Sequence, residues 1–321
     1  MTNKITLITI FIFLFQANSY SQCCAAGNPS GSDISQEGLG KNFFKISLLY
    51  KYSLSKDYFH FNKKYSLPYI EKSNFNYSNV SIAYGLSQRL SLNTELGYFI
   101  NKSQELKINN ENILINSSGI GDISFNARYK LIQKVKPFSQ LYISAGTKIP
   151  VGAFNEEIDG VTIPISLQPS SGALKFNGGI FYLRKSLDKK LGWYSFAIFE
   201  FSNTINKGYL TYKYGNYLQY TLAGIYSFSK KLSAIGNIKV EYRDRDKREE
   251  NLKIESSGSR ILYFSPQFQY NFKRSWNIII NADIPIYKYV NGYQLTNKFA
   301  FSFGIYKAFN LQKSKENSTN P

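Results

Sequence analysis

Apolar and polar side chains alternate at every second position through successive segments of about ten residues, beginning at Asn42 and continuing to Phe309. In the segment 232–243, alternate positions read Leu, Ala, Gly, Ile, Val and Tyr on one side and Ser, Ile, Asn, Lys, Glu and Arg on the other. Successive side chains of a β-strand point to opposite faces, so this period predicts strands. A long strand with one apolar face and one charged face suits a wall between lipid and water.

The segments number about twelve, and an even number returns both chain ends to one side of a membrane, as in bacterial single-chain barrels. The connections alternate in length. Short turns are expected at Ser87–Arg89, Lys134–Pro137, Leu187–Lys190, Ser229–Lys231 and Lys273–Arg274. Longer polar loops are expected at Ser55–Phe75, Lys102–Asn116, Gly152–Gly172, Asn203–Tyr214, Arg245–Gly258 and Tyr289–Thr296. This pattern predicts an all-β fold, a transmembrane antiparallel up-and-down β-barrel.

Closure of the barrel is expected because hydrocarbon offers no hydrogen-bond partner to a backbone N–H or C=O. An open sheet edge in lipid costs several kcal/mol for each unpaired group. The alternative, a large soluble β-sandwich, also alternates, but its strands average about six residues. The segments here are longer, which favours the barrel. The segment 193–202 is less regular, because it is apolar on both faces except at Glu200.

The first residues have the features of a secretory signal: a positive start at Lys4, an apolar run at Ile5–Phe15 and small residues around Ser19. The apolar run is too short for a membrane-spanning helix, which needs about 20 residues. An exported barrel belongs in the outer membrane of a Gram-negative bacterium, in contact with its lipid and lipopolysaccharide. We therefore expect a signal peptide at 1–21, a flexible periplasmic segment at 22–41, the barrel at 42–309 and a polar tail at 310–321.

The only cysteines, Cys23 and Cys24, are adjacent, so a disulfide framework joining distant segments is excluded. They are candidates for a soft-metal site or a lipid anchor, against the simpler interpretation of an unstructured terminus. The formal net charge of +18 would suit nucleic acid, but the basic residues are scattered and the chain is exported. A basic lumen and basic rims facing lipid headgroups explain the charge better, and no nucleic-acid partner is expected.

If the apolar faces look outward, the charged side chains on the opposite faces line the lumen. An excess of basic residues there would draw in anionic or polar solutes. The alternative is that opposite charges pair and plug the bore, because a barrel of about twelve strands lies near the boundary between a filled interior and a channel. The predicted lumen residues are Lys45, Lys51, Glu95, Asp122, Arg128, Lys130, Lys148, Lys175, Lys239, Glu241, Arg243 and Asp283.

A hydrolase of this architecture would need a His beside a Ser or Asp. The only histidine, His60, lies in an aromatic stretch with no nucleophile at strand spacing. The sequence also contains no P-loop, zinc-binding cluster or dinucleotide fingerprint. We therefore expect neither an enzyme nor a cofactor, and a hydrolase that uses His60 is the minor alternative.

Several different short motifs lie along the later two-thirds of the chain. They are Gly119–Asp122, Lys148–Gly152, Leu167–Gly172, Ser265–Pro266, Ile284–Tyr287 and Asn291–Leu295. Together they resemble the outer-membrane barrel family named for the meta-pathway of phenol degradation, from about Gly119 to Phe309. The resemblance implies a transporter, with aromatic compounds as candidate cargo. Val151 and the pair Ser170-Ser171 depart from the family's pattern, and the departure bears on the substrate more than on the fold.

Two functions follow from these expectations. The first is a channel or transporter for small solutes, anionic or aromatic, across the outer membrane. The second is a non-conducting barrel that acts as a receptor, adhesin or assembly partner, supported by the aromatic loop Tyr58–Tyr69 and a narrow bore. The long loop Gly152–Gly172 could fold inward as a constriction or lie outside as a lid. The oligomeric state is left open.

Overall fold

The computed structural model describes residues 38–67, 70–108, 111–158, 160–207, 210–249, 252–272 and 276–311. The predicted signal peptide, Cys23, Cys24 and most of the two flanking segments lie outside these residues. Within the described part, no helix is both long enough and apolar enough to cross a membrane.

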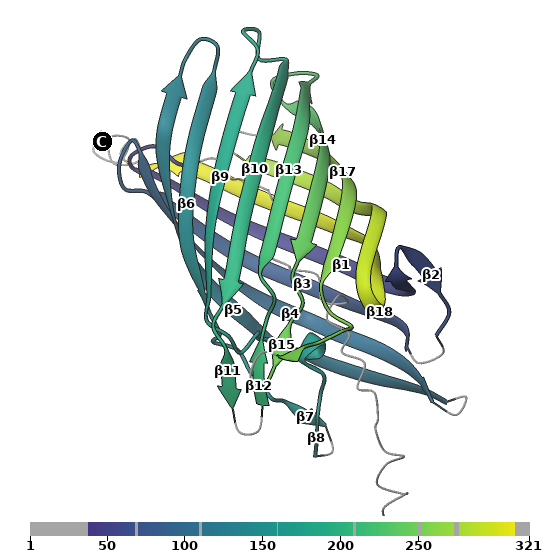
Figure 1. Ribbon diagram of the computed structural model, residues 1–321. Coiled ribbons are helices and arrows are strands. Elements are labelled where there is room, and N and C mark those ends of the chain that lie inside the picture. The colour runs from purple at the N-terminus through teal and green to yellow at the C-terminus, as the bar shows by residue number, and fades with distance from the viewer. Residues whose placement is uncertain are drawn as a thin grey trace, which may run out of the picture.

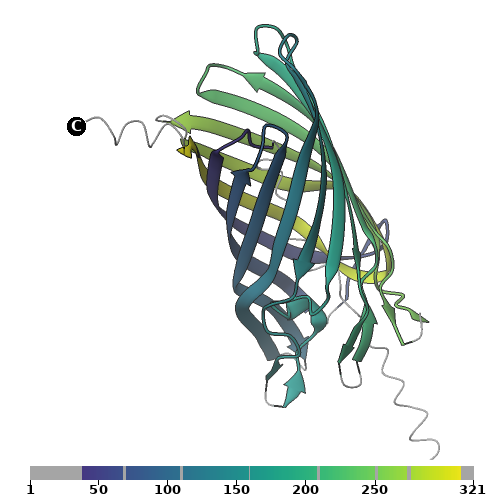
Figure 2. The ribbon, with the colours of Figure 1, turned by 90° about the vertical axis from the view of Figure 1, so that its left-hand side faces the viewer.

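The fold is an antiparallel β-barrel whose wall contains eleven labelled strands, with the short β2 paired on the outside of β1 (Figures 1 and 2). Around the ring the order is β1, β3, β4, β5, β6, β9, β10, β13, β14, β17 and β18, and β18 pairs again with β1. The wall strands are β1 (Phe43–Phe61), β3 (Ile70–Gly85), β4 (Leu90–Ile108), β5 (Glu111–Lys134), β6 (Ser139–Ile149), β9 (Lys175–Lys185), β10 (Leu191–Ser202), β13 (Tyr217–Ser227), β14 (Leu232–Arg243), β17 (Ser259–Phe272) and β18 (Trp276–Asn310).

The last strand, β18, folds back on itself. Its two parts, here called the first and second arms, form two adjacent antiparallel segments of the wall, and each such wall segment is here called a stave. Residues 276–290 pair with β17 and residues 290–310 pair with β1, and every pairing around the ring is antiparallel. A ring of antiparallel neighbours closes only with an even number of staves. Lys288 Nζ donates to Thr296 Oγ1 at 3.1 Å, which places the two arms side by side around the Asn291–Gly292 turn. The prediction of an up-and-down barrel with about twelve strands is therefore confirmed.

The two faces of each strand have the predicted orientation. On β1, Leu48 is 51% exposed on the outer surface and Lys51 is 7% exposed. On β13, Leu222 is 46% exposed and its neighbour Thr221 is completely buried. The barrel thus presents an apolar exterior around an interior with many polar side chains, the reverse of a water-soluble protein and the arrangement of a barrel that spans lipid.

Short turns gather at one end of the barrel, here called the turn end, together with Phe43 and Asn310, which pair with each other. The observed connections at 86–89, 135–138, 186–190 and 228–231 match the predicted turns. In the turn before β10, the Ser186 hydroxyl and the Lys190 N–H donate to Asp188. These hydrogen bonds hold the pKa of the Asp188 carboxyl below its usual value.

Three of the predicted loops at the opposite end, here called the loop end, are wrong in extent. β4 runs to Ile108 and β5 starts at Glu111, β1 runs to Phe61, and β18 continues through 289–296. Beyond a membrane both faces of a hairpin meet water, so the alternation of apolar and polar residues ends although backbone pairing continues. β5, with 24 residues, is far longer than the 9–11 or so that a membrane crossing requires.

The remaining loop-end connections contain small structures of their own. Between β6 and β9 lie β7 (Glu157–Ile158), β8 (Val161–Thr162) and the 3-10 turn η1 (Ile165–Leu167). The connections after β10 and β14 form a four-stranded sheet of β11 (Ile205–Lys207), β12 (Leu210–Lys213), β15 (Lys247–Arg248) and β16 (Leu252–Lys253). β11, β12, β7, β8 and β15 are labelled at the lower end of Figure 1.

Candidate functional site: the lumen and its mouth

None of the twelve predicted lumen residues is exposed on the outer surface. Five are buried and the other seven are half-buried, and all lie on wall strands. The buried ones are Lys45, Lys51, Lys130, Lys239 and Asp283. The half-buried ones are Glu95, Asp122, Arg128, Lys148, Lys175, Glu241 and Arg243. Charged side chains avoid lipid, so the inner face is where the alternation has to put them.

One cluster lies near the loop end of β6, β9 and β10. Lys148 forms an ion pair with Oε2 of Glu200, and Lys175 Nζ lies 3.9 Å from Oε1 of the same carboxylate. Lys175 also lies over the ring of Tyr214, 4.4 Å from its centroid. Glu200 is 8% exposed and was not among the predicted lumen residues. Its signal in the sequence was its position as the one charge in an otherwise apolar strand.

A second cluster surrounds Asp283 on the first arm of β18. Its Oδ2 lies 3.2 Å from Lys239 Nζ and 3.7 Å from Lys51 Nζ, and the Ser265 hydroxyl donates to Oδ1 at 2.7 Å. Lys239 reaches Glu241 Oε1 on its own strand at 3.1 Å. The structure therefore brings four of the predicted residues together here.

Other predicted residues are distributed around the wall. Lys45 lies over the Tyr306 ring at 5.9 Å, Arg243 lies over a Tyr217 ring at 5.3 Å, and Lys130 Nζ donates to Gln133 Oε1 at 2.9 Å. Glu95 accepts a hydrogen bond from Asn93 at 2.8 Å. Arg128 is attracted electrostatically by Glu95. The twelve charges thus form separate groups on the wall and not a single ring.

The ion pairs of the two clusters run along the wall. Lys148 and Glu200 are two strands apart in the ring, Lys175 and Glu200 are on neighbours, and Lys239 and Asp283 are two strands apart. Lys51 and Asp283 are also two staves apart, counting the second arm of β18. Each of these pairs therefore joins nearby staves, and none of them crosses the bore between opposite walls.

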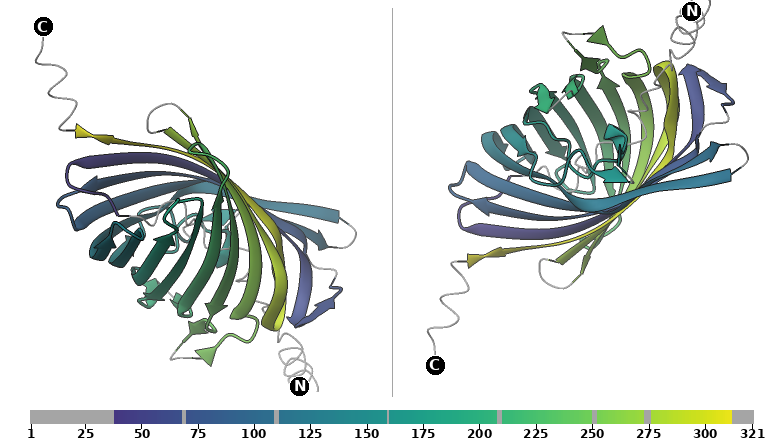
Figure 3. Two further views of the ribbon diagram at one scale, coloured as in Figure 1. Left: turned by 90° about the horizontal axis from the view of Figure 1, so that it is seen from above. Right: turned by 90° about the horizontal axis from the view of Figure 1, so that it is seen from below.

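Residues 150–158 and 160–174, here called segment 150–174, lie across the loop end of the lumen, within the outline of the ring in the right-hand view of Figure 3. On one side it is fixed to the inner faces of β4 and β5. Lys102 Nζ donates to the Gln168 carbonyl at 2.7 Å, and the Ser117 hydroxyl donates to the Leu167 carbonyl. Lys102, like Glu200, was absent from the predicted set. Leu167 and Gln168 are each 2% exposed.

Asp122 attaches the segment through three hydrogen bonds. Its Oδ1 accepts from the Ser170 hydroxyl at 2.7 Å and from the Ser171 N–H at 2.9 Å, and its Oδ2 accepts from the Ser171 hydroxyl at 2.5 Å. A Cβ added to Gly152 would lie 1.7 Å from the Ile120 carbonyl oxygen, so the backbones meet there at a distance that only glycine allows. Three of the motifs noted in the sequence therefore meet at one place.

The opposite side of segment 150–174 contacts the connections that follow β10 and β14. Phe154 and Ile165 pack against a buried cluster that includes Ile205, Tyr212 and Ile254. The Tyr214 hydroxyl donates to the carbonyl of Ser171 at 3.0 Å. The segment is thus held from both sides of the mouth. It has the inward arrangement of the two expected ones and narrows the lumen at the loop end.

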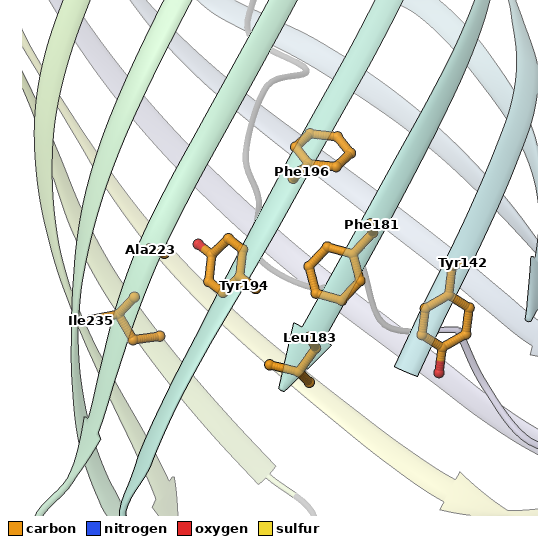
Figure 4. Packing of buried hydrophobic residues seen from close by; sticks show 7 residues of the cluster. All are labelled: Tyr142, Phe181, Leu183, Tyr194, Phe196, Ala223 and Ile235. Carbon is orange, nitrogen blue, oxygen red and sulfur yellow. The ribbon is translucent and has the colours of Figure 1, made fainter. Parts of the chain in front are cut away.

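Between the first charge cluster and the turn end, the inner wall becomes apolar and aromatic. Five neighbouring strands, β6, β9, β10, β13 and β14, contribute buried side chains that pack together (Figure 4). Sequence reasoning did not identify this patch, although the apolar character of both faces of 193–202 indicated it. Its members are Tyr142, Phe181, Leu183, Tyr194, Phe196, Ala223 and Ile235.

His60 lies at the loop end of β1 and stacks on Tyr293, with ring centroids 4.4 Å apart and planes 13° apart. Among the described residues, no hydrogen bond between His60 and a Ser or Asp side chain is found. The described residues also contain no group of three or more His, Cys, Asp or Glu side chains that could hold a metal ion. Cys23 and Cys24 lie outside them.

Comparison with known proteins identifies relatives by sequence pattern and by fold. A family model described as "Putative MetA-pathway of phenol degradation" matches residues 70–303. An outer membrane channel from Pseudomonas putida F1 is 14% identical, with a TM-score of 0.69 over 88% of this chain and 100% of that chain. The translocator domain of the autotransporter NalP from Neisseria meningitidis is 12% identical, with a TM-score of 0.46 over 86% and 91%. No curated protein sequence matches.

Proposed function

We propose that this chain, which belongs to the family named for the MetA-pathway of phenol degradation, is an outer-membrane channel for small solutes whose mouth is narrowed by segment 150–174. The turn end, with both ends of the barrel, faces the periplasm, and the loop end faces the exterior, as in other barrels of this type. The chain reaches this membrane by the predicted signal peptide at 1–21.

The proposal rests on which strands of the wall the ion pairs connect. Charges that filled the bore would have to join opposite walls, whereas the Lys148–Glu200 and Lys239–Asp283 pairs join staves at most two apart. Buried charges arranged in this way line a polar surface and leave the centre of the lumen to water and solute.

The distribution of side chains favours solutes that carry a negative charge and an aromatic ring. Eight of the twelve predicted lumen residues are basic and four are acidic. Lys148 and Lys175 stand at the loop end of β6 and β9, and the aromatic patch with Phe181 lies on the same strands nearer the turn end. A solute such as an aromatic carboxylate would meet the cationic wall first and the aromatic wall second.

Planar-bilayer recording of the refolded protein tests the proposal. We expect discrete conductance steps and a reversal potential in a KCl gradient that reports anion preference. The double variant Lys148→Gln/Arg128→Gln should lower the anion preference, because it removes two inner-wall cations. The matched control Lys190→Gln/Lys230→Gln removes two exposed turn-end cations and should leave the reversal potential unchanged.

A protein that is correctly folded but gives no conductance steps under any voltage would contradict the channel. That result would favour the receptor or assembly-partner hypothesis, whose sequence support is the loop around Tyr58–Tyr69. In the structure Tyr58 is buried and Tyr65 is 48% exposed, so Tyr65 is the better position for a crosslinker in that case.

A further inference from the structure

A pocket of about 500 Å³ opens at the loop end, outside the two charge clusters of the lumen. It lies where β12, β15 and β16 meet the ends of β14, β17 and the first arm of β18. Six basic side chains line it and the only acidic one is Asp244, which accepts a hydrogen bond from the Tyr242 hydroxyl at 2.6 Å. The basic residues are Lys213, Arg243, Arg245, Lys247, Lys253 and Arg260.

Arg260 belongs to the lipid-facing row of β17. Along this strand, Ile261 and Tyr263 are each 6% exposed on the inner face, and Phe264 is 42% exposed on the outer face. Arg260 has the parity of Phe264 and is exposed. They are four positions apart, which corresponds to about 13 Å along the strand. The guanidinium therefore lies beyond the apolar band on the outer surface, at the depth where lipid headgroups begin.

Two tyrosine rings hold this guanidinium in place. Its central carbon lies 5.4 Å from the Tyr242 ring centroid and 6.0 Å from the Tyr289 ring centroid. Tyr242 and Tyr289 are the cross-strand partners of Arg260 on its two sides. The Tyr242 hydroxyl also forms a side-chain hydrogen bond with Arg260, which engages one side of the guanidinium. Its remaining N–H groups form the planar fork that fits two oxygens of a phosphate.

The pocket carries a large excess of positive charge. Within the part of the chain that the structure describes, no ion pair to a carboxylate is found for Lys213, Arg245, Lys253 or Arg260. Like charges this close together repel one another, so an arrangement of this kind is stabilised by a bound anion. An anion with several charged oxygens fits Arg245, Lys253 and Arg260 together better than a single carboxylate does.

We propose that this pocket binds the phosphate groups of a phosphorylated lipid headgroup in the outer leaflet, the chemistry that lipopolysaccharide presents. A free phosphorylated solute has the same chemistry, but the position of Arg260 on the lipid-facing row favours the lipid. The inference rests on the barrel spanning the outer membrane with its loop end outside, which is part of the proposed function. It does not depend on whether the barrel conducts.

The test compares two charge-matched variants of the full chain, refolded in detergent with EDTA present so that divalent cations do not bridge. The pocket variant is Arg245→Gln/Lys253→Gln/Arg260→Gln, and the control is Lys190→Gln/Lys230→Gln/Lys231→Gln at the turn end. Binding of lipopolysaccharide should weaken about 100-fold in the pocket variant, since each basic residue near an anionic surface contributes about 1 kcal/mol. The control should bind as the unmodified protein does.

Three outcomes would overturn the proposal. The first is equal binding by the pocket variant and the control. The second is undiminished binding of enzymatically dephosphorylated lipopolysaccharide to the unmodified protein. The third is binding of inorganic phosphate to the pocket at the affinity found for lipopolysaccharide, which would assign the site to a soluble anion. Bilayer conductance, measured on the same samples, reports the channel separately, and retention of the heat-dependent gel shift confirms that each variant is folded.

Discussion

Glu200 occupies the position between two lysines on the inner wall. It contacts Lys148 on β6 and Lys175 on β9, and only 8% of its surface is exposed. A buried carboxylate shared by two cations compensates both of them for the loss of hydration. Its removal leaves two buried like charges next to each other. The positively charged lumen wall thus depends on a single acidic residue, Glu200, at this position.

We expect Glu200→Gln to destabilise the folded barrel by about 3–5 kcal/mol, the cost of breaking a buried ion pair. The same change should increase anion preference, because two inner-wall cations lose their counter-charge. Unfolding in urea and the reversal potential measure the two effects. Glu111→Gln, an exposed carboxylate at the tip of the β4–β5 hairpin, should change neither. A stable Glu200→Gln barrel with unaltered selectivity would show that this cluster lies away from the ion path.

At the scale of elements, the segment 150–174 combines attachment with close approach. Asp122 receives three hydrogen bonds from Ser170 and Ser171, and Gly152 passes against the backbone of β5. The short strands of this segment, β7 and β8, pair only with each other, whereas each wall strand is paired on both sides. The segment therefore opens locally at a lower free energy than the wall strands do. The mouth is therefore the part of the barrel most able to change its width.

Asp122→Ala should loosen segment 150–174 and raise the mean single-channel conductance, with more frequent current fluctuations. Asp122→Asn retains one oxygen acceptor and should give an intermediate conductance. Gly152→Ala should act in the same direction by a different route, because the added Cβ would collide with the Ile120 carbonyl oxygen. Recordings at a fixed voltage make the comparison. Wild-type conductance in both Asp122→Ala and Gly152→Ala would show that the segment does not limit flow.

The sequence predicts the wall of this barrel better than its mouth. The period of two arises because lipid and lumen impose opposite polarity on neighbouring residues, and it identifies the outer row with Leu48 and Leu222 correctly. The family resemblance drawn from short motifs is also confirmed. Where both faces of a hairpin meet water, as at Lys102–Asn116, the period of two disappears and no longer distinguishes a strand from a loop. Where both faces meet apolar groups, as around Phe196, it no longer distinguishes the inner face from the outer one. Contacts such as Lys102 to Gln168 depend on tertiary packing and leave no local pattern.

At the scale of the whole molecule, closure between β1 and the second arm of β18 should make the barrel resistant to detergent. We expect the refolded protein to migrate differently on an SDS gel before and after boiling, since a closed barrel keeps its backbone hydrogen bonds until heated. A chain truncated after Gly292 lacks the closing arm and should give a single, heat-independent band. Identical migration of the full chain with and without boiling would argue against a closed wall.

The seam that completes the ring joins Phe43, the first residue of β1, to Asn310, the last residue of β18. An exported polypeptide delivers its N-terminal strand first and its closing strand last, so the edge of β1 stays unpaired until the second arm of β18 arrives. A premature stop before the second arm of β18 would therefore yield no closed barrel. Correct assembly of this protein therefore depends on whether the second arm of β18 has paired with β1.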